Sequence, residues 1–169
     1  MDVNFVMEYL SQYGVVFLFV LILLEYMNLP GFPAGIIMPV SGILASNGKM
    51  SLGWTLIVAL VAGLIGSWIL YFLGYYGGEL FLKKCLKKYP KQHEKINSLI
   101  AWVASKGYLG IFIAKLIPMI RTLISIPAGI AKMDFYKYTL FSALGIFVWN
   151  FFFIGAGYIF GESVFQLFS

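Results

Sequence analysis

Long stretches without a charged side chain dominate this sequence. No Asp, Glu, Lys or Arg occurs in residues 9–24, 26–48, 50–78 or 138–161. A helix that crosses a bilayer needs about 20 apolar residues, so 51–77 and 135–161 are predicted to be transmembrane helices. Only 11% of the 169 residues are charged and 61% are hydrophobic, whereas about 25% of a soluble domain is charged. The composition therefore predicts an all-α integral membrane protein with a single domain, 1–169, and excludes a soluble or disordered chain.

Two further apolar segments are interrupted by prolines. These segments are residues 28–48, with Pro30, Pro33 and Pro39, and residues 108–131, with Pro118 and Pro127. A proline inside a helix removes a backbone hydrogen bond and costs about 3 kcal/mol. We expect each segment to be a re-entrant hairpin broken at these prolines, since such backbone is tolerated at membrane depth when protein surrounds it. An ordinary span kinked by proline is the alternative.

The remaining segments are an N-terminal helix and a basic linker. A helix is expected over 8–27, although its continuous apolar run is short for a span. Residues 79–106 contain seven lysines beside an apolar side, and Pro90 divides them into two helices. This amphipathic pattern predicts a cytoplasmic linker, because positive charge collects on the cytoplasmic side. The net charge of +5 is thus an orientation signal, and no nucleic-acid partner is expected.

The two halves of the sequence match each other. Pro30 and Pro39 are nine residues apart, and Pro118 and Pro127 repeat that spacing 88 positions later. Lys-Met, Gly-Tyr and Gly-Glu pairs after each broken segment recur 83 positions later, at 49/132, 74/157 and 78/161. One span separates the two hairpins, so they should enter the membrane from opposite faces. The pattern predicts an inverted repeat, an architecture that is common in transporters.

Three charged residues lie in or beside the apolar segments, namely Glu25, Lys115 and Arg121. A charge at the bilayer centre costs about 2.5–3.5 kcal/mol on insertion scales, so such residues usually have a function. Arg offers a planar fork for phosphate oxygens, and Lys offers a point charge. Two cations against one carboxylate favour an anionic headgroup. Alternatively, Glu25 pairs with one of these cations and holds the hairpins together, or extends to the membrane surface.

These residues also carry a resemblance to a known family. The order Glu25-x4-Pro30-x2-Pro33, Lys115-x2-Pro118-x2-Arg121 and Pro127-x-Gly129 resembles the DedA family, also called the SNARE-associated or VTT domain family. The resemblance covers roughly residues 20 to 161. It implies re-entrant hairpins in inverted repeat and lipid movement across the bacterial cytoplasmic membrane, with Glu25, Lys115 and Arg121 as the functional positions.

The chain departs from the family pattern at several positions. It has Gly35 and Ser67 where the family often has acidic residues, Tyr75 where Arg is frequent, and Lys115 where Arg is usual. Fewer carboxylates weaken the expectation of proton coupling through an acidic pair. Glu25 remains the candidate for proton coupling.

The leading hypothesis is a lipid transporter, not an enzyme, whose partner is a lipid with an anionic phosphate headgroup. The resemblance favours undecaprenyl phosphate, with phosphatidylethanolamine flipping or scrambling as the alternative. A membrane enzyme acting on lipid phosphates lacks a catalytic cluster in the sequence, since Cys85 and His93 are single and no cofactor or metal site is expected. A structural or partner-binding membrane protein is the third hypothesis, and a homo-oligomer is compatible with each.

Overall fold

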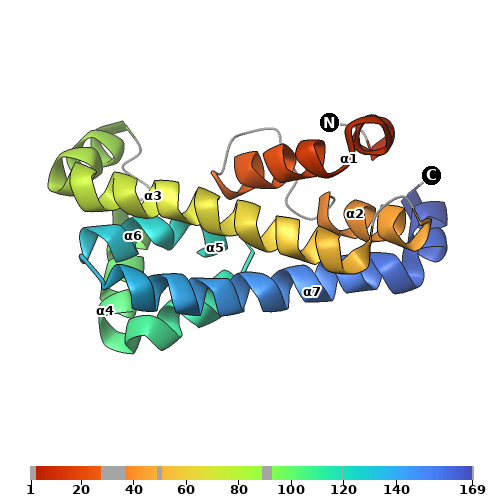
Figure 1. The fold of residues 1–169 in the computed structure, drawn as a ribbon. Coiled ribbons are helices and arrows are strands. Elements are labelled where there is room, and N and C mark those ends of the chain that lie inside the picture. Colours follow the sequence, from red (N-terminus) through yellow and green to blue (C-terminus); the bar gives the residue numbers. More distant parts are fainter. Residues whose placement is uncertain (1–2, 28–36, 49–50, 89–92, 119, 169) are drawn as a thin grey trace. The chain divides into compact units, whose positions relative to one another are not determined.

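The structure is a computed structural model that describes residues 3–27, 37–48, 51–88, 93–118 and 120–168. Its helices are α1 (Val3–Tyr26), α2 (Ile37–Ser46), α3 (Leu52–Lys88), α4 (His93–Lys115), α5 (Ile120–Leu123), α6 (Ser125–Ile130) and α7 (Phe135–Phe168) (Figure 1). The described part of the chain contains no strand. The predicted all-α class is confirmed.

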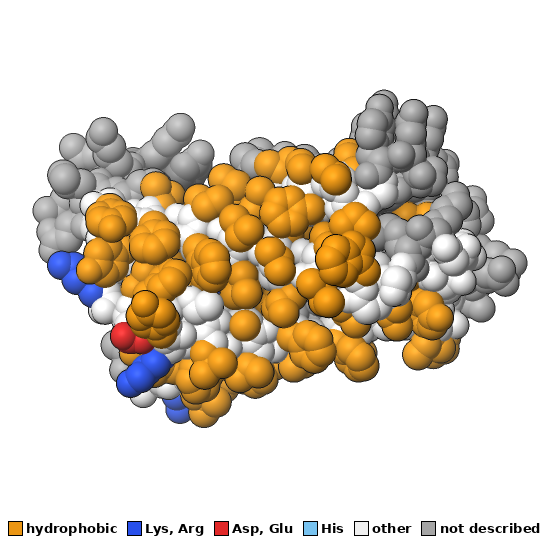
Figure 2. Space-filling view, in the orientation of Figure 1, with side chains coloured by type: hydrophobic (Ala, Val, Ile, Leu, Met, Phe, Trp, Pro, Cys, Tyr) orange, Lys and Arg blue, Asp and Glu red, His pale blue; other side chains and the backbone are white. Residues whose placement is uncertain are grey.

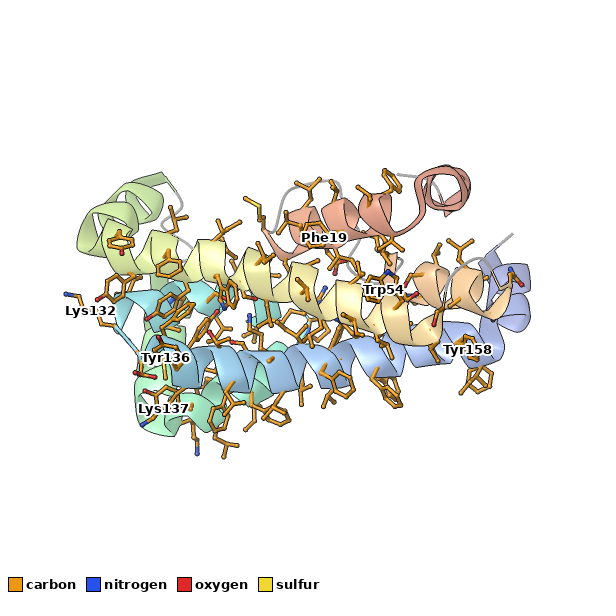
Figure 3. All side chains as sticks on the ribbon, in the orientation of Figure 1. Phe19, Trp54, Lys132, Tyr136, Lys137 and Tyr158 are labelled. Atoms are coloured by element: carbon orange, nitrogen blue, oxygen red, sulfur yellow. The ribbon has the colours of Figure 1, made fainter. Side chains whose placement is uncertain are left out.

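Helices α3 and α7 contain the two long apolar segments that the sequence predicts. The parts long and apolar enough to cross a membrane are Leu52–Gly78 and Phe135–Gly161. Many large hydrophobic side chains on them are exposed, including Trp54, Tyr136 and Tyr158 (Figure 3). Figure 2 shows hydrophobic side chains over most of the described surface on one face. An apolar surface of this extent marks contact with a membrane or with another protein.

Two glycines with positive φ separate the basic linker from the apolar helices. Gly78, with φ 43°, interrupts α3, and Gly107, with φ 58°, interrupts α4. Glycine adopts this backbone conformation without the steric cost that a Cβ adds. The expected boundaries of the linker, 79–106, therefore coincide with two backbone kinks. Pro90, which was expected to divide it, lies outside the described residues.

The chain divides into two compact units. Unit 1 comprises Met1–Ile65 and Ile146–Ser169, and unit 2 comprises Gly66–Gly145. In unit 1, α2 packs against α1, and both contribute to an apolar core with the neighbouring parts of α3 and α7. In unit 2, α4 contacts both α5 and α6. Unit 1 thus contains α1, α2 and one part of each long helix, and unit 2 contains α4, α5, α6 and the other part of each.

Helices α3 and α7 run antiparallel within unit 2. The indole N–H of Trp68 donates to Thr139 Oγ1 at 3.1 Å. Tyr71, one turn further along α3, donates its hydroxyl to the carbonyl of Met133, which precedes α7. Contacts therefore move backwards along α7 as α3 advances. Phe135 packs on Trp68 and Tyr71 with ring centroids 5.7 Å apart in each case, which closes this end of the unit.

The prolines occupy two kinds of position. Pro118 lies between the end of α4 and the start of α5, so the chain is broken there. Pro39 and Pro127 instead lie in the first turns of α2 and α6, where a proline is tolerated because the first N–H groups of a helix have no partner within it. At these two positions the helix continues through the proline. Pro30 and Pro33 lie outside the described residues.

Small residues allow close backbone contacts that recur in the two units. A Cβ on Gly42 of α2 would overlap the carbonyl oxygen of Ile154 in α7, all within unit 1. A Cβ on Gly129 of α6 would overlap the carbonyl oxygen of Tyr71 in α3, all within unit 2. Helix α2 of the first sequence half therefore packs on α7 of the second half, and α6 of the second half packs on α3 of the first. The repeat also pairs Gly74 with Gly157. Gly74 of α3 lies against Ile126 of α6, and Gly157 of α7 lies against Pro39 of α2, so both glycines belong to these two contacts.

Candidate functional site

Lys115 is a buried lysine at the point where α4 ends. Its side chain is 1% exposed. Its ammonium nitrogen donates hydrogen bonds to Ser67 Oγ at 2.8 Å and to Ser125 Oγ at 3.0 Å. Ser67 belongs to α3 and Ser125 to α6, so the ammonium group joins three helices of unit 2. Both acceptors are neutral hydroxyls and do not balance its charge.

Gly145 of α7 makes room for the stem of this lysine. A Cβ at Gly145 would lie 2.5 Å from Lys115 Cβ and 3.0 Å from the carbonyl oxygen of Phe112. Real Cβ atoms do not approach other atoms so closely, so any larger residue would displace α4. Glycine at this position therefore lets α4 lie directly on α7 and fixes where the lysine side chain begins.

Two tyrosines support the serine on the other side. Tyr138 donates its hydroxyl to the carbonyl oxygen of Ser67 at 3.3 Å. Its ring stacks on that of Tyr71, with centroids 4.6 Å apart, and both side chains are buried. Stacked aromatic pairs contribute about 0.5–1.5 kcal/mol beyond the area they bury. The polar cluster of Lys115, Ser67 and Ser125 is therefore held in rigid surroundings.

Arg121 is the second buried cation of unit 2. It lies in the short helix α5, is 1% exposed, and follows Lys115 after the break at Pro118. The structure thus places both predicted cations in one unit, on the two helices that the break joins. A guanidinium group presents five N–H donors in a planar fork and stays charged.

Glu25 lies in the other unit. It occupies the last turn of α1 and is 3% exposed, next to Tyr26, which is fully buried. Tyr26 belongs to the apolar core of unit 1. A carboxylate in such surroundings loses most of its hydration. That Glu25 pairs with Lys115 or Arg121 stays a prediction.

Neither Ser67 nor Ser125 was predicted from the sequence to take part in the site. Ser67 was named only as a departure from the family pattern, because an acidic residue is frequent at that position in similar proteins. A further signal was available: a serine in the middle of a charge-free span can hydrogen-bond to a neighbouring helix at membrane depth. The cluster of Lys115, Ser67 and Ser125 has the chemical groups of an anion-binding site. It offers N–H and O–H donors in a site of low dielectric constant, which suits an anion.

Comparison with known families identifies the chain. The VTT domain, the defining domain of the DedA family, matches residues 32–159, which include α2 to α6 and most of α7. The chain therefore belongs to the VTT domain (DedA) family, and the resemblance noted in its sequence is confirmed. No solved structure matches it significantly.

Curated relatives are similar over most of the chain. It is 32% identical over 148 residues to undecaprenyl phosphate transporter A of Staphylococcus aureus, covering 85% of this chain and 72% of that protein. It is 31% identical over 163 residues to an alkaline phosphatase-like protein of Lactococcus lactis, covering 94% and 74%. Protein DedA of Escherichia coli is 24% identical over 162 residues, covering 91% and 73%.

Proposed function

We propose that this protein is a multi-pass lipid transporter of the bacterial cytoplasmic membrane, which moves a lipid with a phosphate headgroup from one leaflet to the other. Undecaprenyl phosphate is the substrate we favour, because the relative from Staphylococcus aureus is named as its transporter. Flipping or scrambling of phosphatidylethanolamine is the alternative. The protein itself need not break a bond in the lipid, so transport is proposed in place of enzymatic activity.

One observation carries this proposal: the ammonium group of Lys115 is buried and hydrogen-bonded to two neutral serine hydroxyls. A buried charge is costly unless an opposite charge or strong hydrogen bonds compensate for it. A phosphate oxygen would provide the opposite charge. Arg121, across the break at Pro118, would provide a second and bidentate contact to the same headgroup.

The helix lengths support a re-entrant architecture. Gly14–Tyr26, Ile37–Ser46 and Ile120–Ile130 are apolar helices of only 10–17 residues, and a helix must be about 20 residues long to span a bilayer. We propose that α1 from Gly14 onward and α2 form the first hairpin, and that α4 from Gly107 onward with α5 and α6 forms the second. This extends the first hairpin beyond the 28–48 segment, since α2 packs on α1.

The crosswise glycine contacts support an inverted repeat. Helices α2 and α6 each pack on the long helix of the other sequence half, at Gly42 and at Gly129. A single crossing by α3 between the hairpins would put them on opposite faces, as in transporters in which two repeats meet near the membrane centre. The lipid tails would stay in the bilayer during transport. Glu25 would compete for the cations and release them when it binds a proton or when the lipid arrives.

Purification and reconstitution test the proposed function. Native mass spectrometry of the purified protein should show a co-purified lipid with a phosphate headgroup. In liposomes that contain this lipid, the protein should move the headgroup to the outer leaflet without changing its mass. Cleavage of the headgroup would instead indicate an enzyme, and neither movement nor cleavage would favour a structural or partner-binding role.

A further inference from the structure

Asn150 of α7 is a fully buried amide whose side chain has no hydrogen-bond partner within the described residues. It is 0% exposed, and neither its Oδ1 nor its Nδ2 atom is hydrogen-bonded. Ile146 and Ile154, one turn before and after it, are also 0% exposed and belong to the apolar core of unit 1. Burying an amide without partners is unfavourable by several kcal/mol in an apolar medium. Such a group needs a partner that the described residues do not provide, such as a bound water molecule or a ligand.

The repeat assigns Asn150 a counterpart. Asn150 lies 15 residues after the start of the apolar span Phe135–Gly161, and Ser67 lies 15 residues after the start of Leu52–Gly78. Both residues are fully buried and both lie two residues past the middle of their spans. In unit 2 this position binds the ammonium group of Lys115. In unit 1 the same position carries an amide whose donor and acceptor are both available.

The surroundings of the two positions are also related. In unit 2 the stem of Lys115 lies on Gly145 of α7. In unit 1 the ring of Tyr26, at the end of α1, lies on Gly63 of α3, where a Cβ would be 3.0 Å from it and from Ile146. The end of α1 therefore lies close to Ile146, one turn before Asn150 in α7. Asn150 thus takes the place of Ser67 in the repeat, although the 83-residue offset pairs Gly145 with Ala62, the neighbour of Gly63, so the two surroundings are similar and not identical.

We propose that Asn150 is a second binding position for the lipid headgroup, located in unit 1 and used in a step distinct from binding at Lys115. This inference rests on the proposed function. The amide Nδ2 donates to a phosphate oxygen, and Oδ1 accepts a proton when the phosphate is monoprotonated, which is the minor form above the second pKa of a phosphate monoester near pH ~6. An amide binds an anion more weakly than an ammonium group does. The position in unit 1 therefore favours release.

Three substitutions at this position separate binding from packing. Asn150→Ala and Asn150→Ser leave similar space, but only serine keeps a donor and an acceptor. Asn150→Leu fills the space with an apolar group of similar size and removes the unsatisfied amide. The readouts are thermal stability and the rate at which undecaprenyl phosphate in liposomes becomes accessible to a phosphatase added outside. Ser41→Ala is the matched control, since Ser41 is equally buried but its hydroxyl is already bonded to the carbonyl of Met38 at 2.7 Å.

We expect Asn150→Leu to melt at a higher temperature than the wild type and to flip the lipid about tenfold more slowly or worse, the loss of a hydrogen bond to a charged group. Asn150→Ala should be similarly slow, Asn150→Ser should recover part of the rate, and Ser41→Ala should keep it. Wild-type rates in Asn150→Leu and Asn150→Ala would overturn the inference and indicate an amide that holds only structural water. A wild type that flips no lipid would refute the proposed function itself, and the inference with it.

Discussion

The ammonium nitrogen of Lys115 lies 2.8 Å from Ser67 Oγ, although the two residues are 48 positions apart in the sequence. The contact joins α4 to α3. The buried ammonium group of Lys115 is therefore stabilised by a hydroxyl from the first half of the chain. Ser125 completes the arrangement from α6 at 3.0 Å. Removal of either hydroxyl leaves the ammonium group with a single described partner.

Ser67→Ala and Ser125→Ala should each destabilise the protein. A buried group that loses its partner retains its desolvation penalty, so we expect a loss of about 1–3 kcal/mol in the free energy of unfolding. Ser105→Ala is the control, because Ser105 is exposed and its hydroxyl donates to the carbonyl of Trp102 in its own helix. Denaturant or thermal unfolding in detergent measures the differences. Equal stability of all three variants would contradict the structural role of the serine pair.

Gly42→Ala and Gly129→Ala should be severely destabilising. Each new Cβ would overlap a backbone carbonyl oxygen, of Ile154 and Tyr71 respectively, and a backbone cannot move aside as a side chain can. We expect a loss of at least about 3 kcal/mol or a failure to fold. Gly155→Ala in α7 has no atom within 4 Å of the new Cβ and should be neutral or stabilising by up to about 1 kcal/mol. Yield and melting temperature in detergent distinguish the two groups.

The basic linker should face the cytoplasm. A cysteine introduced by Lys88→Cys, in a chain where Cys85→Ser removes the natural thiol, should resist a membrane-impermeant maleimide in intact cells and react after permeabilisation. The reason is that seven lysines in 79–106 outweigh Lys49 in the opposite loop. Ready labelling in intact cells would reverse the orientation.

Arg121 should tolerate little change if it binds phosphate. Arg121→Ala should abolish transport while the protein still folds. Arg121→Lys should recover little activity, because a point charge does not reproduce a bidentate fork. Lys115→Arg should be tolerated, since the family usually has arginine at that position. Liposome flipping and melting temperature, measured on the same preparations, test these expectations.

Substitutions at Glu25 distinguish a role in transport from a purely structural ion pair. Glu25→Gln keeps the shape of the side chain, so we expect slower turnover with nearly normal lipid binding and stability. In a structural pair, loss of one partner costs about 3–5 kcal/mol, and the double variant Glu25→Gln with Arg121→Gln should regain both stability and transport. Recovery in the double variant would therefore favour the structural pair.

The sequence predicted the long elements well because their signals are long. The absence of charge over 50–78 and 138–161 locates both spans, and the 83-residue repeat relates them, since Leu52–Gly78 and Phe135–Gly161 differ by that number at each end. The break at Pro118 also followed from local sequence. Local rules were less informative for Pro39 and Pro127, since a proline can interrupt a helix or occupy its first turn, and tertiary contacts decide between these positions.

The polar partners could not be predicted by the same rules. Ser67 and Ser125 come from helices far apart in the sequence from one another, and only folding brings their hydroxyls to Lys115. Asn150 could not be recognised as a candidate site residue from the sequence for a similar reason. Its importance depends on full burial and on the lack of a partner among the described residues, and neither property is visible in the sequence.

The central claim is that Lys115 binds the phosphate of a transported lipid, and one comparison tests it most directly. Wild-type protein and Lys115→Met are reconstituted at equal density, and the initial rate at which undecaprenyl phosphate reaches the outer leaflet is measured beside the melting temperature of each protein. Methionine keeps much of the length of the side chain and removes the buried charge, so we expect Lys115→Met to melt at or above the wild-type temperature and to lose transport by about a hundredfold or more. A folded Lys115→Met protein that flips the lipid at the wild-type rate would contradict the account.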